Sequence, residues 1–149
     1  MTKHQIFEIF IQELLKQYEK PSHNDLSRLK ALNLLFLAII KNKQFLKYFD
    51  NFQIYPLWIY EQDIFEAIKD HKLETITINQ QHTQKIKSKK FSPKLEEIAK
   101  QLVKSLKEDE KDLINLSVSQ LTDIIHQLPY RRLPKNFNLK KISKKFLIN

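Results

Sequence analysis

The stretch "LSRLKALNLLFLAII" (residues 26–40) decides the fold. Its apolar residues recur at helical spacing and then fill the remaining faces of the helix as well. They are Leu26, Leu29, Leu32, Leu35, Phe36 and Ile39 on one face, with Leu34, Leu37 and Ile40 on the others. A helix that is apolar all round is buried on all sides. This segment therefore predicts a central helix, which we expect to begin near Asn24 or Asp25, two residues suited to an N-cap.

Four other segments carry helical signals. Apolar residues recur at helical spacing in residues 4–18, in the stretch from Ile59 to Ile68, and most regularly in residues 92–106, where Ser92 supplies a cap and Pro93 the first helical position. A fourth helix is predicted at residues 118–128. Ser117 and Gln120 form an S-x-x-Q capping box at its start. "KQFLKYFD" (residues 43–50) predicts a short helix or turn.

The remaining segments predict little regular structure. "LETITIN" (residues 73–79) alternates apolar and polar residues, which indicates a short strand, and "QQHTQKIKSKK" (residues 80–90) predicts a polar, mobile loop. Together the patterns predict a mainly α protein. We expect one compact helical domain, residues 1–133, around the buried central helix, followed by a basic C-terminal tail, residues 134–149.

The composition excludes several classes of protein. The chain has no Gly, so no P-loop, dinucleotide-binding loop or G-x-S-x-G elbow is present. It has no Cys, which excludes disulfides and thiol nucleophiles. Glu8 and Glu13 interrupt the N-terminal apolar stretch, and the longest apolar run, Leu34–Ile40, is too short to cross a membrane. We expect a cytoplasmic protein without membrane contact.

No residue pattern indicates catalysis, a metal or a cofactor. The histidines have no partner at the spacing of a metal site; they are His4, His23, His71, His82 and His126. Glu61, Asp63 and Glu66 lie near the start of one short helix, where acids favour the helix dipole. The sequence predicts a protein that is not an enzyme.

The net charge of +9 is unevenly distributed, because no acidic residue follows Asp123. One basic cluster consists of Lys85, Lys87, Lys89, Lys90 and Lys94, and another of Arg131, Arg132, Lys135, Lys140, Lys141, Lys144 and Lys145. Such asymmetry favours an acidic partner, either nucleic acid or an acidic protein face. The alternative is that the lysines are simply solvated.

The segment "SVSQLTDIIHQLPYRR" (residues 117–132) has two interpretations. As a DNA-recognition helix it would follow a tight turn and read bases from its N-terminal residues. Here the turn has no Gly, and Arg131 and Arg132 lie beyond the C-terminal end of the helix. The sequence therefore favours a packing helix, while phosphate binding by the basic tail remains an alternative.

The only tryptophan, Trp58, lies between Tyr55 and Tyr60 in a stretch that contains Pro56. Large aromatic residues in loops fill cores, and they are also enriched at the energetic centres of protein interfaces. Both interpretations are retained for this aromatic group.

Three segments, in this order, resemble the Panacea-domain, SocA-like antitoxin family of bacteria and phages. They are "LSRLKALNLLFLA" (Leu26–Ala38), "IYPLWIYEQDIFEAI" (Ile54–Ile68) and "VSQLTDIIHQLPYRR" (Val118–Arg132). Tyr55 stands where the family has Gly before the proline, and Tyr130 where it has Trp. The resemblance implies a small, mostly helical fold without catalysis that neutralises a co-encoded toxin by direct contact or delivers it to a protease.

Two functions follow as expectations. The first is a protein-binding module with no cofactor whose partner is a cognate toxin, and its expected contact residues are Tyr55, Trp58, Tyr60, His126, Tyr130, Arg131 and Arg132. The alternative is a nucleic-acid-binding regulator, whose expected contacts are Lys87, Lys89, Lys90, Arg131, Arg132, Lys140 and Lys141. The sequence does not indicate an oligomeric state.

Overall fold

The computed structural model describes residues 2–17, 26–54, 59–107 and 112–127. More than half of these residues are helical, so the prediction of a mainly α protein is confirmed. The α-helices are α1 (Thr2–Leu15), α2 (Arg28–Lys41), α3 (Gln62–Lys69), α4 (Pro93–Lys107) and α5 (Val118–His126). The short helices η2 (Lys43–Phe45) and η3 (Leu113–Asn115) and the strands β1 (Phe52–Ile54), β2 (Ile59–Glu61), β3 (Ile76–Ile78) and β4 (Thr83–Lys85) complete the order.

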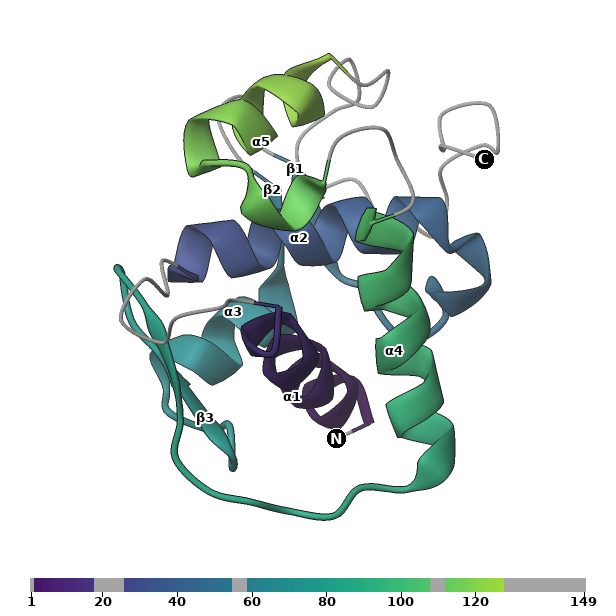
Figure 1. Ribbon diagram of the computed structural model, residues 1–149, viewed down its shortest axis with the longest axis vertical. Coiled ribbons are helices and arrows are strands. Elements are labelled where there is room, and N and C mark those ends of the chain that lie inside the picture. The colour runs from purple at the N-terminus through teal and green to yellow at the C-terminus, as the bar shows by residue number, and fades with distance from the viewer. Residues whose placement is uncertain (1, 18–25, 55–58, 108–111, 128–149) are drawn as a thin grey trace.

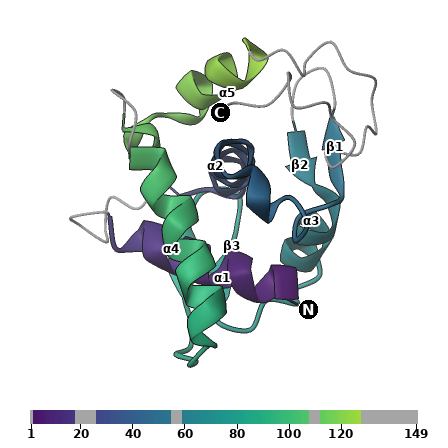
Figure 2. The same cartoon turned by 90° about the vertical axis from the view of Figure 1, so that its right-hand side faces the viewer.

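Helix α2 is the centre of the structure. Figure 2 looks along its axis and shows α5, α4, α1 and the β1–β2 hairpin arranged around it. Leu32 and Leu35 are buried as predicted, whereas Leu29 near the start of the helix is 37% exposed. The N-cap is Ser27, whose hydroxyl accepts a hydrogen bond from the Lys30 amide. The helix therefore begins later than predicted, and the predicted caps Asn24 and Asp25 themselves lie outside the described residues.

The other helices pack against α2 or against one another. Helix α1 packs against α4 and α3, and α2 packs against α4, α5 and β2 (Figure 1). Helix α4 begins at Pro93 as predicted, with Ser92 Oγ accepting a hydrogen bond from the Leu95 amide. Its period-3.6 pattern buries Ile98, Leu102 and Leu106 and leaves the opposite face in solvent.

A hairpin precedes α3, where the sequence predicted a loop and a longer helix. Strands β1 and β2 pair antiparallel, with Phe52 opposite Glu61 and Ile54 opposite Ile59. Ile59 therefore belongs to a strand, and α3 begins only at Gln62. The prediction was wrong because three-residue strands are too short to show an alternating pattern, and their pairing and packing on α2 stabilise them instead.

A second hairpin forms beside α3. Strand β3 lies within the strand predicted at residues 73–79, but its partner β4 lies in the segment predicted to be a mobile loop. Thr83 holds β4 in place, because its hydroxyl donates a hydrogen bond to the Leu26 carbonyl at 2.5 Å. The loop prediction was wrong for Thr83–Lys85, whereas residues 86–90 are exposed and have no regular structure.

Helix α5 begins with the predicted capping box. Ser117 Oγ accepts from the Gln120 amide at 3.2 Å, and the Gln120 side chain accepts from the Ser117 amide at 2.9 Å. In the described part of the chain this helix ends at His126, and the tail predicted for residues 134–149 lies outside the described residues. No helix of the described residues has both the length and the apolarity needed to cross a membrane.

The capping box supports a stability prediction. Ser117→Ala removes the acceptor of one otherwise unsatisfied helix amide, and we expect the free energy of unfolding to fall by about 1 kcal/mol. Urea denaturation followed by circular dichroism measures this loss. Ser119→Ala, an exposed substitution in the first turn of the same helix, is the control and should be nearly neutral. Equal losses for the two variants would mean that the capping box contributes nothing specific.

Candidate functional site

The predicted partner-binding residues are only partly described. Tyr60 lies in β2 with 7% of its surface exposed, and its ring centroid is 4.9 Å from that of Phe65. It is therefore a core residue in this structure and offers little surface to a partner. His126 is half-buried at the end of α5. Tyr55, Trp58, Tyr130, Arg131 and Arg132 lie outside the described residues.

Three of the predicted nucleic-acid contacts lie on the exposed segment between β4 and α4. Lys87 and Lys90 are exposed, and Lys89 forms an ion pair with Glu74 and lies 5.6 Å from the Phe91 ring centroid. The ammonium of Lys89 lowers the pKa of the exposed Glu74 carboxyl. Lys89 is thus already engaged, while Lys140 and Lys141 lie outside the described residues.

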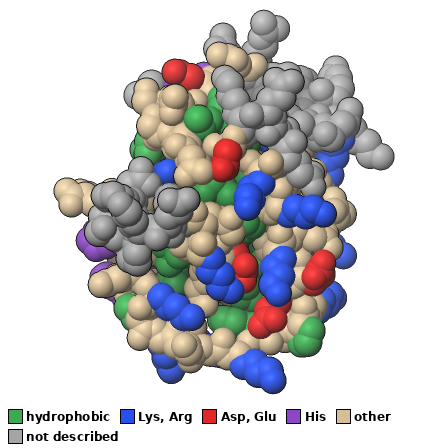
Figure 3. Space-filling view, viewed as in Figure 1, with side chains coloured by type: hydrophobic (Ala, Val, Ile, Leu, Met, Phe, Trp, Pro, Cys, Tyr) green, Lys and Arg blue, Asp and Glu red, His purple; other side chains and the backbone are tan. Residues whose placement is uncertain are grey.

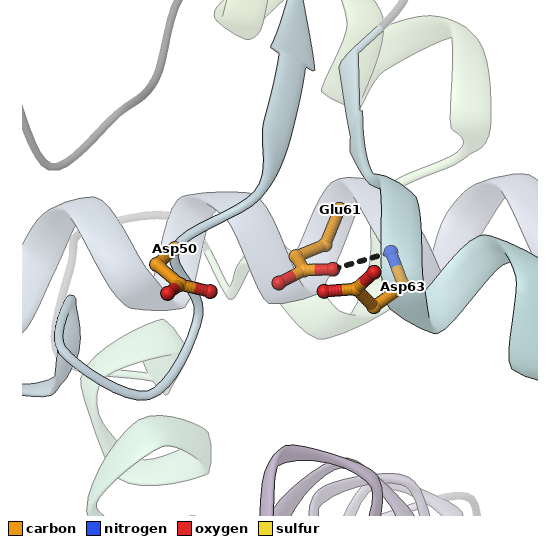
Figure 4. Close-up of side chains that lie close together, drawn as sticks. All are labelled: Asp50, Glu61 and Asp63. Atoms are coloured by element: carbon orange, nitrogen blue, oxygen red, sulfur yellow. Dashed lines mark hydrogen bonds between the residues drawn. The ribbon is translucent and has the colours of Figure 1, made fainter.

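A buried lysine gathers three carboxylates at the junction of α1, the β1–β2 hairpin and α3. Lys3 Nζ donates to Glu61 at 2.7 Å, to Asp63 at 2.6 Å and to Asp50 at 3.0 Å. Figure 4 shows the three carboxylates, which come from the loop before β1, the end of β2 and the start of α3. We call these four residues the Lys3 cluster.

Glu61 has two roles in the Lys3 cluster. It is fully buried, and besides pairing with Lys3 its carboxylate caps α3 by accepting from the amides of Asp63 at 2.7 Å and Ile64 at 3.2 Å. The sequence indicated that acids here suit the helix dipole, and Glu61 and Asp63 do lie at the start of α3. It did not indicate the ion pair, because Lys3 lies far away along the chain.

The pKa values in the Lys3 cluster follow from this geometry. Burial alone would lower the pKa of Lys3, but its hydrogen bonds to Asp63 and Glu61 outweigh that effect and raise the pKa well above its usual range. Burial raises the pKa of Glu61, against the opposing influence of Lys3 and of the Ile64 amide. Lys3 is therefore firmly cationic.

Oxygen atoms of Asp50, Glu61 and Asp63 lie within 4.8 Å of one another, which is a spacing that a hard cation accepts. The Lys3 ammonium, however, hydrogen-bonds to all three carboxylates and supplies their positive charge. The arrangement ties the first turn of α1 to the β1–β2 hairpin and α3. We interpret the Lys3 cluster as a structural element of the fold.

A surface groove offers a different kind of site. Residues 42–48, which follow α2, line two adjoining hollows with the solvent-facing side of α4, and the hollows share Glu97 and Gln101. Their volumes are about 380 and 370 Å³. We call the pair of hollows the α4 groove.

The two ends of the α4 groove differ in chemistry. At one end Asn42 Nδ2 donates to Ser105 Oγ at 2.8 Å, and Ser105 Oγ donates to the Leu102 carbonyl at 2.7 Å. The polar side chains of Asn42 and Ser105 therefore have hydrogen-bond partners within the protein. At the other end the lining includes three apolar or aromatic side chains, which are Phe45, Tyr48 and Ile98.

Lysines surround the α4 groove. Lys100 and Lys104 line its polar end, and Lys47 and Lys94 line its apolar end. Figure 3 shows Lys and Arg side chains interspersed with acidic ones on the face that carries α4. The sequence predicted the helix and its polar face, but not the groove, because the opposite wall comes from residues about fifty positions earlier.

No family model matches this chain, and no curated protein or solved structure is similar to it.

Proposed function

We propose that the chain is a non-catalytic protein-binding module of the antitoxin type, which neutralises a co-encoded toxin or delivers it to a protease by direct contact. The observation that carries the proposal is the α4 groove, a concave surface with an apolar end, a polar end and a surplus of positive charge. Protein interfaces commonly combine such an apolar pocket with a polar rim. The resemblance of three segments to the Panacea-domain, SocA-like antitoxins supplies the antitoxin character. A cytoplasmic setting is part of the same proposal.

A co-expression experiment tests this function. The product of the neighbouring open reading frame is produced with and without this chain, and both cell growth and co-purification are measured. We expect the neighbouring product to arrest growth alone, and the full chain to restore growth and form a stable complex. A harmless neighbouring product, or a toxic one that does not bind the chain, would contradict the proposal.

The aromatic group supplies a sharper version of the same test. Trp58→Ala is expected to weaken the complex by about 2 kcal/mol, because buried aromatic residues dominate many interfaces. Tyr60→Ala is unsuitable for this purpose, since Tyr60 is buried and its loss would destabilise the fold. If Trp58→Ala lowers the unfolding free energy and leaves affinity unchanged, Trp58 is a core residue instead.

A nucleic-acid-binding regulator is the second candidate, and the exposure of Lys87 and Lys90 favours it. Binding to duplex DNA would then weaken steeply with salt, with a slope of about −0.9 per phosphate contact. Charge reversal at Arg131, Arg132, Lys140 and Lys141 would abolish it. For the protein-binding function we expect only weak, non-specific duplex binding.

A further inference from the structure

We infer that the α4 groove receives an extended acidic segment of the partner protein, which places an apolar side chain in the hollow at Phe45, Tyr48 and Ile98 and carboxylates beside Lys100 and Lys104. This inference rests on the proposed function, because it names the surface and the chemistry by which the partner would be recognised.

The first reason is charge. Lys47, Lys94, Lys100 and Lys104 line the groove against the single acid Glu97. Among the described residues no carboxylate pairs with Lys94, Lys100 or Lys104, whereas Lys3, Lys16 and Lys89 each have an acidic partner. Unneutralised cations around a concave surface attract an anionic ligand.

The second reason is shape. The two hollows adjoin along α4 and share Glu97 and Gln101, so together they are elongated. An extended peptide advances by about 3.3 Å per residue and points successive side chains to opposite sides. Such a segment can fill the apolar hollow and present acidic side chains to lysines further along the groove.

The third reason separates a peptide from a nucleic acid. Bound single strands need aromatic faces on which bases stack and a continuous cationic track for phosphates. Lys47 Nζ lies 5.3 Å from the Tyr48 ring centroid and so covers one face of that ring. Glu97, which accepts a hydrogen bond from Gln101 Nε2 at 3.2 Å, interrupts the cationic track at its middle. Both features favour an acidic peptide.

A defined probe tests the inference with the full chain. It is a fluorescein-labelled peptide of alternating Asp and Gly residues with one Leu near an end, and binding is measured by fluorescence anisotropy. Lys100→Glu combined with Lys104→Glu should weaken binding about tenfold, because two attractive pairs become repulsive. Lys69→Glu with Lys72→Glu is the matched control, since it changes the net charge equally at the exposed end of α3 and should weaken binding less than twofold.

The apolar contact has its own test. Gln44 is exposed and lines the apolar hollow, so Gln44→Trp should fill the hollow without disturbing the core and should weaken binding severalfold. Replacing the Leu of the peptide with Gly should weaken binding to the wild type and have little further effect on Gln44→Trp. Amide resonances of residues 42–48 and 94–105 should shift on peptide addition.

Several results would overturn the inference. They are equal losses for the groove and control charge reversals, peptide-induced shifts confined to other residues, or tighter binding of a labelled oligothymidine at the same residues. The co-encoded protein separates the two proposals. If the co-encoded protein binds the wild-type chain and the groove variants with equal affinity, the inference fails and the proposed function stands. If it does not bind, the proposed function fails, and the peptide titration alone decides the inference.

Discussion

Lys3→Met is expected to lower the free energy of unfolding by about 3 kcal/mol. Removing one partner of a buried ion pair costs about 3–5 kcal/mol, because the other charge is left in a poorly solvated place. Here Glu61 is fully buried, while the side chains of Asp50 and Asp63 are 46% and 34% exposed and can be resolvated. The lower end of the range therefore applies. Urea denaturation at about pH 7 measures the loss.

The control is Lys16→Met, in the turn directly after the same helix. The side chain of Lys16 is 66% exposed and pairs with Glu13 at 3.0 Å, and such surface pairs contribute about 0–1 kcal/mol. A loss in Lys3→Met no larger than in Lys16→Met would show that the Lys3 cluster does not stabilise the fold.

The deficit of Lys3→Met should shrink as the pH falls. Burial raises the pKa of Glu61 in the folded state, and loss of Lys3 removes the main opposing influence. At pH values between the unfolded pKa of Glu61, near 4.5, and its raised folded pKa, the folded variant binds more protons than the unfolded variant. The free energy of unfolding of Lys3→Met therefore increases as the pH falls through this range. We therefore expect the difference between variant and wild type to be smaller at about pH 5 than at about pH 7.

The wild type should change in the same direction over this range but less, because the Lys3 ammonium opposes the rise in the pKa of Glu61. The pKa of Lys3 is raised, so its stabilising contribution is fully present below the unfolded value of 10.5 and is lost only as the pH rises through the folded pKa. If the deficit of Lys3→Met is constant from about pH 7 to about pH 5, Glu61 is not the group that Lys3 compensates.

Leu35→Ala is expected to cost about 2–5 kcal/mol of unfolding free energy. Leu35 is fully buried in α2, the helix that contacts α4, α5 and β2, so truncation leaves a cavity that three neighbouring elements cannot easily close. Urea denaturation measures the loss, and a smaller slope against denaturant would indicate that the transition is no longer two-state.

Leu29→Ala in the same helix is the matched control. Leu29 is 37% exposed, so the same substitution removes less buried surface and should cost about 1 kcal/mol. A loss below about 1 kcal/mol in Leu35→Ala would mean that α2 is peripheral, which would contradict the arrangement in Figure 2.

The sequence by itself determined the helices that have strong local patterns. Residues 34–40 are apolar on every face, and only a central position buries every face of a helix. Helix α4 combines an uninterrupted apolar stripe with Ser92 and Pro93 at its start, and α5 has its capping box at Ser117. In each case residues within one or two turns supply the information, because helix periodicity and capping are local interactions.

The tertiary structure alone decided what those helices pack against. Strands β1, β2 and β4 contain three residues each, too few for an alternating pattern, and pairing with a neighbouring strand defines them. The Lys3 cluster joins residues 47 to 60 positions apart, and the α4 groove joins residues 42–48 to residues 94–105. Periodicity shows which face of a helix is buried but not which surface covers it, and an ion pair between distant residues leaves no pattern in the sequence. For that reason the fold class was predictable from local patterns, whereas the site depended on long-range packing.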